Sequence, residues 1–226
     1  MMRSAKILGT YGISLDSVAE IIQDHDHHLD HLDRTLEQAE ARLNHDIEWK
    51  RRCLAALREQ REIISHGIGT VYFAELDEMA YLEYYGAEKL RANKKLQRQV
   101  DQWLQGMPIV MPAPCCPREL VGQDCYCPAG FMVRQADMDF LGLREEENVR
   151  VLPARLCVCT TVAQREEVGI MAKEAIEPLL IFIQQTGLCV AGDALFRCIS
   201  FESNENSSSK IYYHVMLPVE VGKTPK

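Results

Sequence analysis

The residues of this chain best suited to binding chemistry are aromatic, acidic and imidazole side chains on segments that alternate like β-strands. In the segment 211–219, alternation places Tyr212, His214 and Met216 on one face and an apolar set on the other. The apolar set suits a face packed against helices, so we expect His214 to point at a pocket. An apolar cleft with a few polar groups is the usual form of a small-molecule site.

The predicted pocket combines aromatic rings with carboxylates. Aromatic faces attract a cation by about 0.5–2 kcal/mol each, and carboxylates would add to that attraction. An aromatic residue on a strand is also commonly a core residue, so a structural role for each ring stays open. The residues predicted to bind the ligand are Tyr72, Glu75, Tyr126, Phe131, Asp137, Phe196, Tyr212, His214 and Met216.

Histidine and cysteine pairs offer an alternative, which is metal or redox sensing. His27 and His31 stand at helical spacing, and the cysteines pair at 115–116, 125–127 and 157–159. The histidines have no second cluster that would complete a metal site. Cysteines two apart share a strand face, and a buried cysteine behaves as a small apolar residue. We therefore predict no metal and no cofactor, and keep sensing by the cysteines as the alternative.

A catalytic role is a second alternative. His214 with Glu75 or Asp137 could act as a general base. The chain has no Ser-His-Asp order, nucleophile elbow or phosphate loop. We therefore predict that the protein is not an enzyme.

Composition places the chain among ordinary globular proteins. It has 226 residues, of which 47% are hydrophobic and 26% charged, with a net charge of −8. That charge disfavours DNA binding by this chain alone, since nucleic-acid binding usually shows a basic face. No apolar run suggests a membrane helix, and the opening residues lack the core of a signal peptide. Nine cysteines, an odd number, fit reduced thiols. The expected location is the cytoplasm, with no membrane partner.

Two helices are predicted before the possible site. The segment 15–22 follows Ser14 as an N-cap and is amphipathic. From position 26 the apolar residues repeat at spacings of three and four, with a stutter near 46–50, as in a coiled coil. Such a seam needs a partner helix, so we predict a dimer. The residues predicted to dimerise are Leu29, Leu32, Leu36, Leu43, Ile47, Leu54 and Leu57.

The remainder predicts an α+β domain, a pseudo-duplicated antiparallel sheet with helices on one face and the other face free for a ligand. Helices are expected at 87–106 and 166–186, and strands at 70–76, 109–111, 119–126, 131–137, 149–161, 194–201 and 211–219. The predicted divisions are a helical segment at 1–25, the dimerisation helix at 26–66 and the α+β domain at 69–222.

The first two parts resemble the MerR family of transcription regulators. The stretch from Ile7 to Ile22 is similar to the second helical pair of the family's DNA-binding domain, which precedes a long dimerisation helix. That resemblance implies an antiparallel coiled coil between two copies. The family's N-terminal helix-turn-helix and wing would precede Ile7 and are not in this chain, so DNA is expected to be reached only through a head outside it. The expected partner is a second copy, or a full-length relative.

The third part resembles the GyrI-like effector domain. The residues that carry the resemblance are Val151-Leu152-Pro153-Ala154-Arg155, Gly192-Asp193-Ala194-Leu195-Phe196 and Tyr212 to Val219. The resemblance implies multidrug sensing, with a small amphipathic or aromatic effector; a small GyrI-like hydrolase is the alternative. Many such domains place a glutamate where this chain has His214, and a neutral imidazole weakens the case for a cationic ligand.

Overall fold

The computed structural model describes residues 2–23, 27–84, 93–165, 170–171, 173–204 and 207–222. The chain forms two compact units, which divide between Ala55 and Ala56, inside the long helix. None of the described helices combines the length and apolarity needed to cross a membrane.

The first unit consists of helices. They are α1 (Met2–Thr10), α2 (Leu15–Gln23) and the first part of α3 (His28–His66). Ser14 caps α2 by accepting a hydrogen bond from the Ser17 backbone N–H at 3.1 Å, as its sequence predicts. Ile13, Val18 and Ala39 form a small buried core between the helices. The predicted helix at 15–22 is confirmed.

The α3 helix is continuous over 39 residues, so the stutter near 46–50 does not interrupt it. Its predicted seam is mostly uncovered within a single chain. The exposed members of the seam are Leu29, Leu36, Leu43, Ile47, Leu54 and Leu57, whereas Leu32 is half-buried. An apolar stripe this long on a charged helix is unfavourable in water without a partner.

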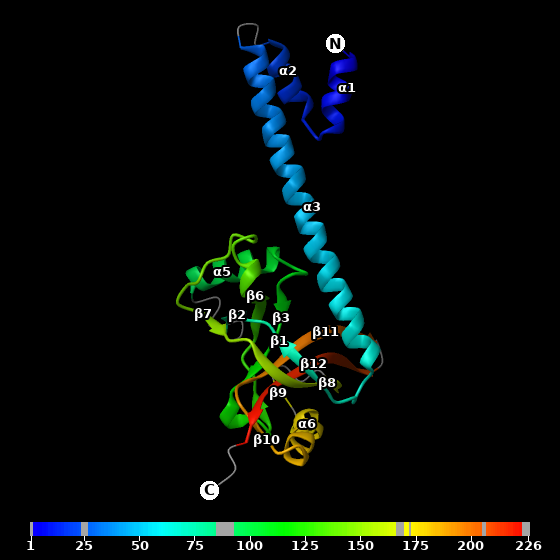
Figure 1. The fold of residues 1–226 in the computed structure, drawn as a ribbon, viewed down its shortest axis with the longest axis vertical. Helices are drawn as coiled ribbons and strands as arrows, with labels where there is room; N and C mark the ends of the chain where they lie inside the picture. Colours follow the sequence, from blue (N-terminus) through cyan, green and yellow to red (C-terminus); the bar gives the residue numbers. More distant parts are fainter. Residues whose placement is uncertain are drawn as a thin grey trace. The chain divides into compact units, whose positions relative to one another are not determined.

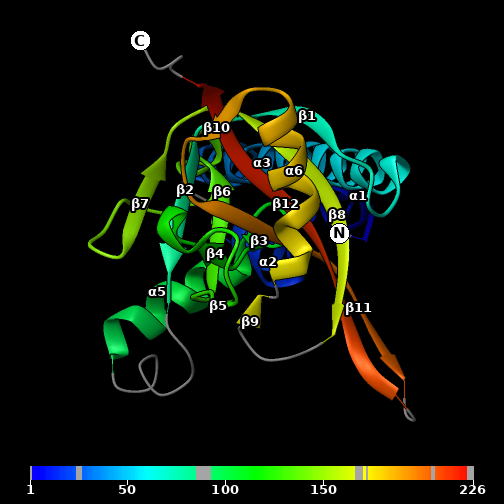
Figure 2. The same cartoon turned by 90° about the horizontal axis from the view of Figure 1, so that it is seen from below.

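The second unit contains a six-stranded antiparallel sheet. Its order is β1-β8-β12-β11-β4, with β10 also paired to β12. The strands are β1 (Tyr72–Leu76), β8 (Arg155–Arg165), β12 (Ser207–Val221), β11 (Ala194–Asn204), β4 (Cys115–Cys116) and β10 (Leu188–Val190). The β11–β12 hairpin extends beyond the rest of this sheet (Figure 2).

A smaller antiparallel sheet lies beside it, in the order β3-β6-β2-β7. Its strands are β3 (Met111–Pro112), β6 (Gly130–Arg134), β2 (Met79–Glu83) and β7 (Val149–Leu152). The remaining pair is β5 (Cys125–Tyr126) with β9 (Ile170–Met171). Two short 3₁₀ turns are η1 (Arg118–Leu120) and η2 (Gln135–Asp137).

A helix accompanies each of the two larger sheets (Figure 1). Helix α6 (Lys173–Gln185) packs Ile176 and Leu179 against Phe196, Val215 and Leu217 of the six-stranded sheet. Helix α5 (Lys94–Gln105) is capped by Asn93, whose side chain accepts hydrogen bonds from two backbone N–H groups. The predicted α+β class is confirmed, although the strands divide between separate sheets instead of forming one.

The other face of the six-stranded sheet meets the smaller sheet in a second core. Cys157, Cys159, Leu195 and Met216 from the first sheet cluster with side chains of the second. The members from the second sheet and its flanks include Met79, Tyr81, Met111 and Met132. Gly130 is required here, since a Cβ at that position would lie 2.1 Å from the Tyr81 hydroxyl oxygen.

Several predicted elements need correction. The segment 119–126 is not a strand: it contains the end of η1, which follows Pro117, and only the two residues of β5. Strand β2 was not predicted, because its residues show no clear alternation and all but the last are buried. The predicted helices at 87–106 and 166–186 correspond to α5 and α6, with 85–92, 166–169 and 172 outside the described residues.

Candidate ligand-binding site

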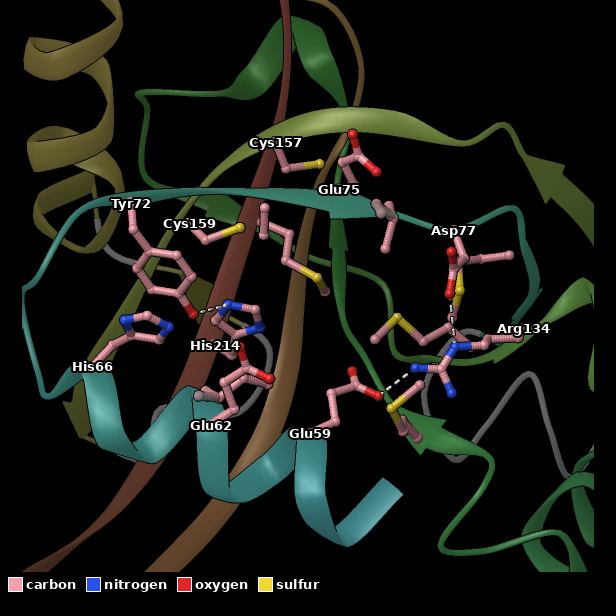
Figure 3. A pocket seen from close by; sticks show the side chains of 17 residues that line it. Glu59, Glu62, His66, Tyr72, Glu75, Asp77, Arg134, Cys157, Cys159 and His214 are labelled. Atoms are coloured by element: carbon pink, nitrogen blue, oxygen red, sulfur yellow. Dashed lines mark hydrogen bonds and ion pairs between the residues drawn. The ribbon is translucent and has the colours of Figure 1, made fainter. Parts of the chain in front are cut away.

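A cavity of about 260 Å³ lies among the two larger sheets and the last turns of α3 (Figure 3). The elements that form it all belong to the second unit. Its volume lies just below the range of roughly 300–1,000 Å³ that is usual for drug-sized ligands. A small occupant therefore suits it.

The six-stranded sheet supplies the first wall. Strand register places Tyr72 opposite Cys159, and Cys159 opposite Met216, on one face of three adjacent strands. His214 lies on the same face of β12, two residues before Met216. Both residues line the cavity, whereas Val215 and Leu217 pack on the α6 side. The predicted alternation along β12 is confirmed.

The smaller sheet and its flanks supply the second wall. Met79, Met111 and Met132 line the cavity with Met216 from the first wall, and all four are buried. The polarizable, unbranched methionine side chain adapts to ligands of different shape. No aromatic or acidic pattern marks the first three in the sequence, so they were not predicted as site residues.

The last turns of α3 supply the third wall. Glu59, Glu62, Ile63 and His66 line the cavity and stand at the i, i+3, i+4 and i+7 spacing of one helical face. None of the four was predicted as a site residue from the sequence. Their spacing marks a shared face, but only the sheet packed against it identifies this face as a cavity wall.

Glu59 is the centre of an ion-pair network that joins the three walls. Its carboxylate pairs with Arg134 of β6 at 2.5 Å and with Arg197 of β11. Arg134 also donates to Asp77 at 2.9 Å. Burial opposes the charge of Arg134, but Glu59 and Asp77 outweigh it and raise its pKa. Arg197 is only 4% exposed, so its charge depends on Glu59 for compensation.

His214 is buried and neutral at physiological pH. Burial lowers its pKa to about 4; the nearby Arg197 and His66 act in the same direction, and Glu59 opposes them. Its Nε2 is 2.9 Å from the Tyr72 hydroxyl, whereas its Nδ1 is buried without a hydrogen-bond partner. His66 stacks on Tyr72, with ring centroids 3.8 Å apart. One ring nitrogen is therefore held, and the other is unsatisfied.

Tyr72, Cys157 and Cys159 of the first wall are uncharged at neutral pH. Burial raises the pKa of Tyr72 to about 12 and that of the Cys157 thiol to about 12. Burial and the neighbouring Cys157 raise the pKa of Cys159 further. Both sulfurs therefore remain thiols, which disfavours nucleophilic attack by either cysteine.

Four of the nine predicted ligand-binding residues line the cavity, namely Tyr72, Glu75, His214 and Met216. The side chain of Glu75 nevertheless points away from His214 (Figure 3), because alternation along β1 puts it on the opposite face from Tyr72. Glu75 therefore lines the cavity, but its carboxylate is not directed at the imidazole of His214.

The other five do not come together there. Phe196 lies in the core beneath α6, opposite Val215, and Phe131 stacks on Tyr84 with centroids 5.1 Å apart. Asp137 is buried in η2, and Tyr212 lies farther along β12, where its hydroxyl donates to Glu202. These four residues do not line this cavity. Phe196 and Phe131 lie on strand faces turned away from it, whereas Tyr212 shares the face of His214 but lies farther along β12, and residue type reveals neither feature. The Tyr126 side chain lies outside the described residues.

The cysteine pairs differ in geometry. Cys157 and Cys159 share a face, as predicted. Cys115 and Cys116 diverge: Cys115 accepts a hydrogen bond from Arg150 at 2.9 Å in one core, and Cys116 belongs to the core under α6. Burial raises the pKa of Cys115 to about 12 despite Arg150. Within the described residues, no three or more His, Cys, Asp or Glu side chains form a group that could hold a metal ion.

Comparisons with known proteins give structural similarities only. No protein-family model matches the chain. No curated protein matches it either. EcmrR, in the EcmrR–DNA complex of EcmrR-RPo, is similar at 14% identity over 97% of this chain and 82% of that one, with a TM-score of 0.40.

Two further solved structures are similar over about two thirds or more of the chain. The EcmrR C-terminal domain shows 15% identity over 67% of this chain and 97% of that one, with a TM-score of 0.39. A hydrolase from Listeria innocua shows 12% identity over 72% of this chain and 98% of that one, with a TM-score of 0.42. At these scores and identities, the similarities carry no conclusion about what the cavity binds.

Proposed function

We propose that this chain is the ligand-sensing and dimerising part of a transcription regulator of the MerR type. The observation that carries the proposal is the third wall of the cavity, since Glu59, Glu62, Ile63 and His66 belong to the same helix that presents the open apolar seam. A ligand in the cavity would contact the dimerisation helix directly. No covalent chemistry is needed for this role.

The proposed partner of α3 is the same helix of a second copy, paired antiparallel. Six seam residues are exposed in the single chain, and their spacing matches a coiled coil. A heterodimer with a full-length relative would use the same seam. Dimerisation would place two cavities on one assembly, so ligand binding at each could bias its geometry.

Signal transfer follows from linkage. A ligand shifts the equilibrium between two arrangements of a protein only by its difference in affinity for them. Here the difference in affinity would arise at the Glu59 network. An occupant of the cavity would contact the face of α3 on which Glu59 pairs with Arg134 and Arg197. Ligand occupancy would thus alter how the end of α3 is anchored.

The alternative is a small hydrolase with His214 as general base. Its free Nδ1 favours this alternative, but a pKa of about 4 makes His214 a weak base at neutral pH. Hydrolysis of 2-naphthyl acetate would separate the two functions. Turnover by the wild type that His214→Gln abolishes would support the hydrolase.

A thermal-shift screen tests the sensing function. The purified chain is screened against neutral, cationic and anionic aromatic compounds, beside Ala74→Phe, which fills the cavity from β1. Phe73→Leu on the opposite face of β1 is the matched control. A compound that stabilises the wild type and the control but not Ala74→Phe supports the proposal. Failure of every compound to stabilise the wild type would contradict it.

A further inference from the structure

We infer that the cavity selects a neutral amphipathic molecule whose single hydrogen-bonding group pairs with Nδ1 of His214. The inference rests on the proposed sensing function and adds the chemical class of the ligand. It follows from the charges around the cavity, the unsatisfied imidazole nitrogen and the composition of the walls.

The charged groups at the cavity are already compensated or directed elsewhere. Glu59 pairs with Arg134 and Arg197, and Asp77 pairs with Arg134. The carboxylate of Glu75 points away from His214. Glu62 is the remaining lining carboxylate, and it is exposed to solvent, which screens its attraction for a cation. A charged ligand would therefore lose its hydration without gaining a buried counter-charge.

Anions are disfavoured for the same reason. Of the lining basic side chains, Arg134 is paired with two carboxylates, and His66 is exposed and stacked on Tyr72. Arg197 is held by Glu59. His214 stays neutral, since burial and Arg197 oppose its protonation. The described residues thus leave no uncompensated buried cation for a carboxylate or sulfonate.

A neutral hydrogen-bonding group, by contrast, can pair with the unsatisfied Nδ1 of His214. His214 is 5% exposed, its Nε2 is occupied by the Tyr72 hydroxyl, and its Nδ1 has no partner. The hydroxyl of Tyr72 can donate or accept, so either tautomer of the imidazole can be presented to the ligand. An alcohol or phenol also donates and accepts, and it fits both tautomers.

The walls suit an apolar body next to that group. Four buried methionines and the thiols of Cys157 and Cys159 line the same cavity as the imidazole and give it a soft, polarizable surface. Methionine side chains can change rotamer to admit the ligand to Nδ1. The cavity volume of about 260 Å³ favours a body of one or two rings.

Four probes with one shared skeleton test this selection on the full chain by isothermal titration calorimetry. They are 2-naphthylmethanol, protonated 2-naphthylmethylamine, 2-naphthoate and 2-methylnaphthalene. We expect the alcohol to bind best and each charged probe to bind at least about tenfold more weakly. The hydrocarbon should also bind about tenfold more weakly, because it leaves Nδ1 unpaired.

Two variants assign the preference to His214. In His214→Leu the alcohol should lose its advantage over the hydrocarbon, whereas Tyr212→Phe, which removes a hydroxyl outside the cavity, should keep it. His214→Gln should restore part of the advantage, and circular dichroism checks that each variant is folded. If His214→Leu does not fold, a preference for alcohol shared by wild type and His214→Gln, together with weak binding of both ions, remains the supporting result.

The outcomes separate this inference from the sensing function. Tighter binding of the ammonium or the carboxylate than of the alcohol overturns the inference and leaves a ligand-binding cavity. So does equal binding of alcohol and hydrocarbon, or binding of other screened compounds but none of the four probes. If no compound of either set binds, both proposals fall.

Discussion

At the scale of single residues, two buried basic groups at or next to the cavity differ in charge: His214 lines the cavity, and Arg197 pairs with the lining residue Glu59. Arg197 is buried as a cation and depends on Glu59, whereas His214 is buried as a neutral imidazole and depends on Tyr72. The difference has a physical reason. A guanidinium cannot give up its proton in a protein, so it requires a carboxylate, but an imidazole can escape the cost of burial by staying neutral.

His214 makes stability depend on pH. Its pKa is about 4 in the folded protein, below the ordinary value of 6.5, so acid favours the unfolded chain, where the imidazole binds its proton more tightly. The contribution of the neutral imidazole to the free energy of unfolding is fully present above about pH 6.5. It is lost progressively towards pH 4, by on the order of 3 kcal/mol. Urea unfolding at several pH values measures it.

His214→Gln is the control for that pH dependence. The variant changes only residue 214 and retains every other side chain near the cavity, so the difference between the two curves isolates the imidazole. Parallel curves for wild type and variant between pH 7 and pH 4.5 would contradict the prediction.

Removal of the Glu59 charge tests the ion-pair network. In Glu59→Gln, Arg197 stays buried without its counter-charge, so we expect the free energy of unfolding to fall by about 1–3 kcal/mol, a range reduced because Glu59 is itself partly exposed. Glu48→Gln is the control on the same helix, since its partners Arg51 and Arg52 are more open to solvent than Arg197. The control should lose less than about 1 kcal/mol. An equal fall in the free energy of unfolding for the two variants would show that the Glu59 network stabilises the fold no more than an exposed ion pair does.

At the scale of elements, α3 has two different tasks along its length. Its last turns contribute a wall of the cavity, and its earlier turns present the exposed seam. The periodicity that predicts the helix is a property of the sequence alone. What each part of the apolar face covers depends on the surface packed against it.

Charges placed in the seam test dimerisation. The double variant Leu36→Glu/Leu43→Glu should shift the chain from dimer to monomer in sedimentation velocity at micromolar concentration, because two carboxylates cannot be buried in an apolar interface without partners. We expect the dimer to weaken at least about tenfold. Glu40→Gln, off the seam, should leave the dimer intact. A wild-type monomer under these conditions would contradict the seam's assignment.

At the scale of the whole molecule, the cavity is a product of three elements that lie far apart in the chain. The β12 strand carries His214, β1 carries Tyr72, and α3 carries Glu59, and the network of hydrogen bonds and ion pairs joins them to β6 and β11. A bound ligand would therefore contact both sheets and the helix at the same time.

Hydrogen exchange tests that connection. Binding of a cavity ligand should slow amide exchange in residues 59–66 of α3 and in β1 and β12, because the ligand bridges these walls. The α5 helix, which contributes no lining residue, should exchange at its free rate. Protection confined to the strands, with α3 unchanged, would argue against signal transfer through the helix.

The sequence by itself determined what is periodic in this protein. The spacing of leucines predicts α3, and the alternation along β12 separates His214 and Met216 from Val215 and Leu217, because both patterns depend only on local backbone geometry. Tertiary structure alone decided which faces meet. It assigned Met79, Met111, Met132 and Glu59 to the cavity and Phe196 to the core beneath α6, since strand register and sheet packing join residues that no local pattern relates.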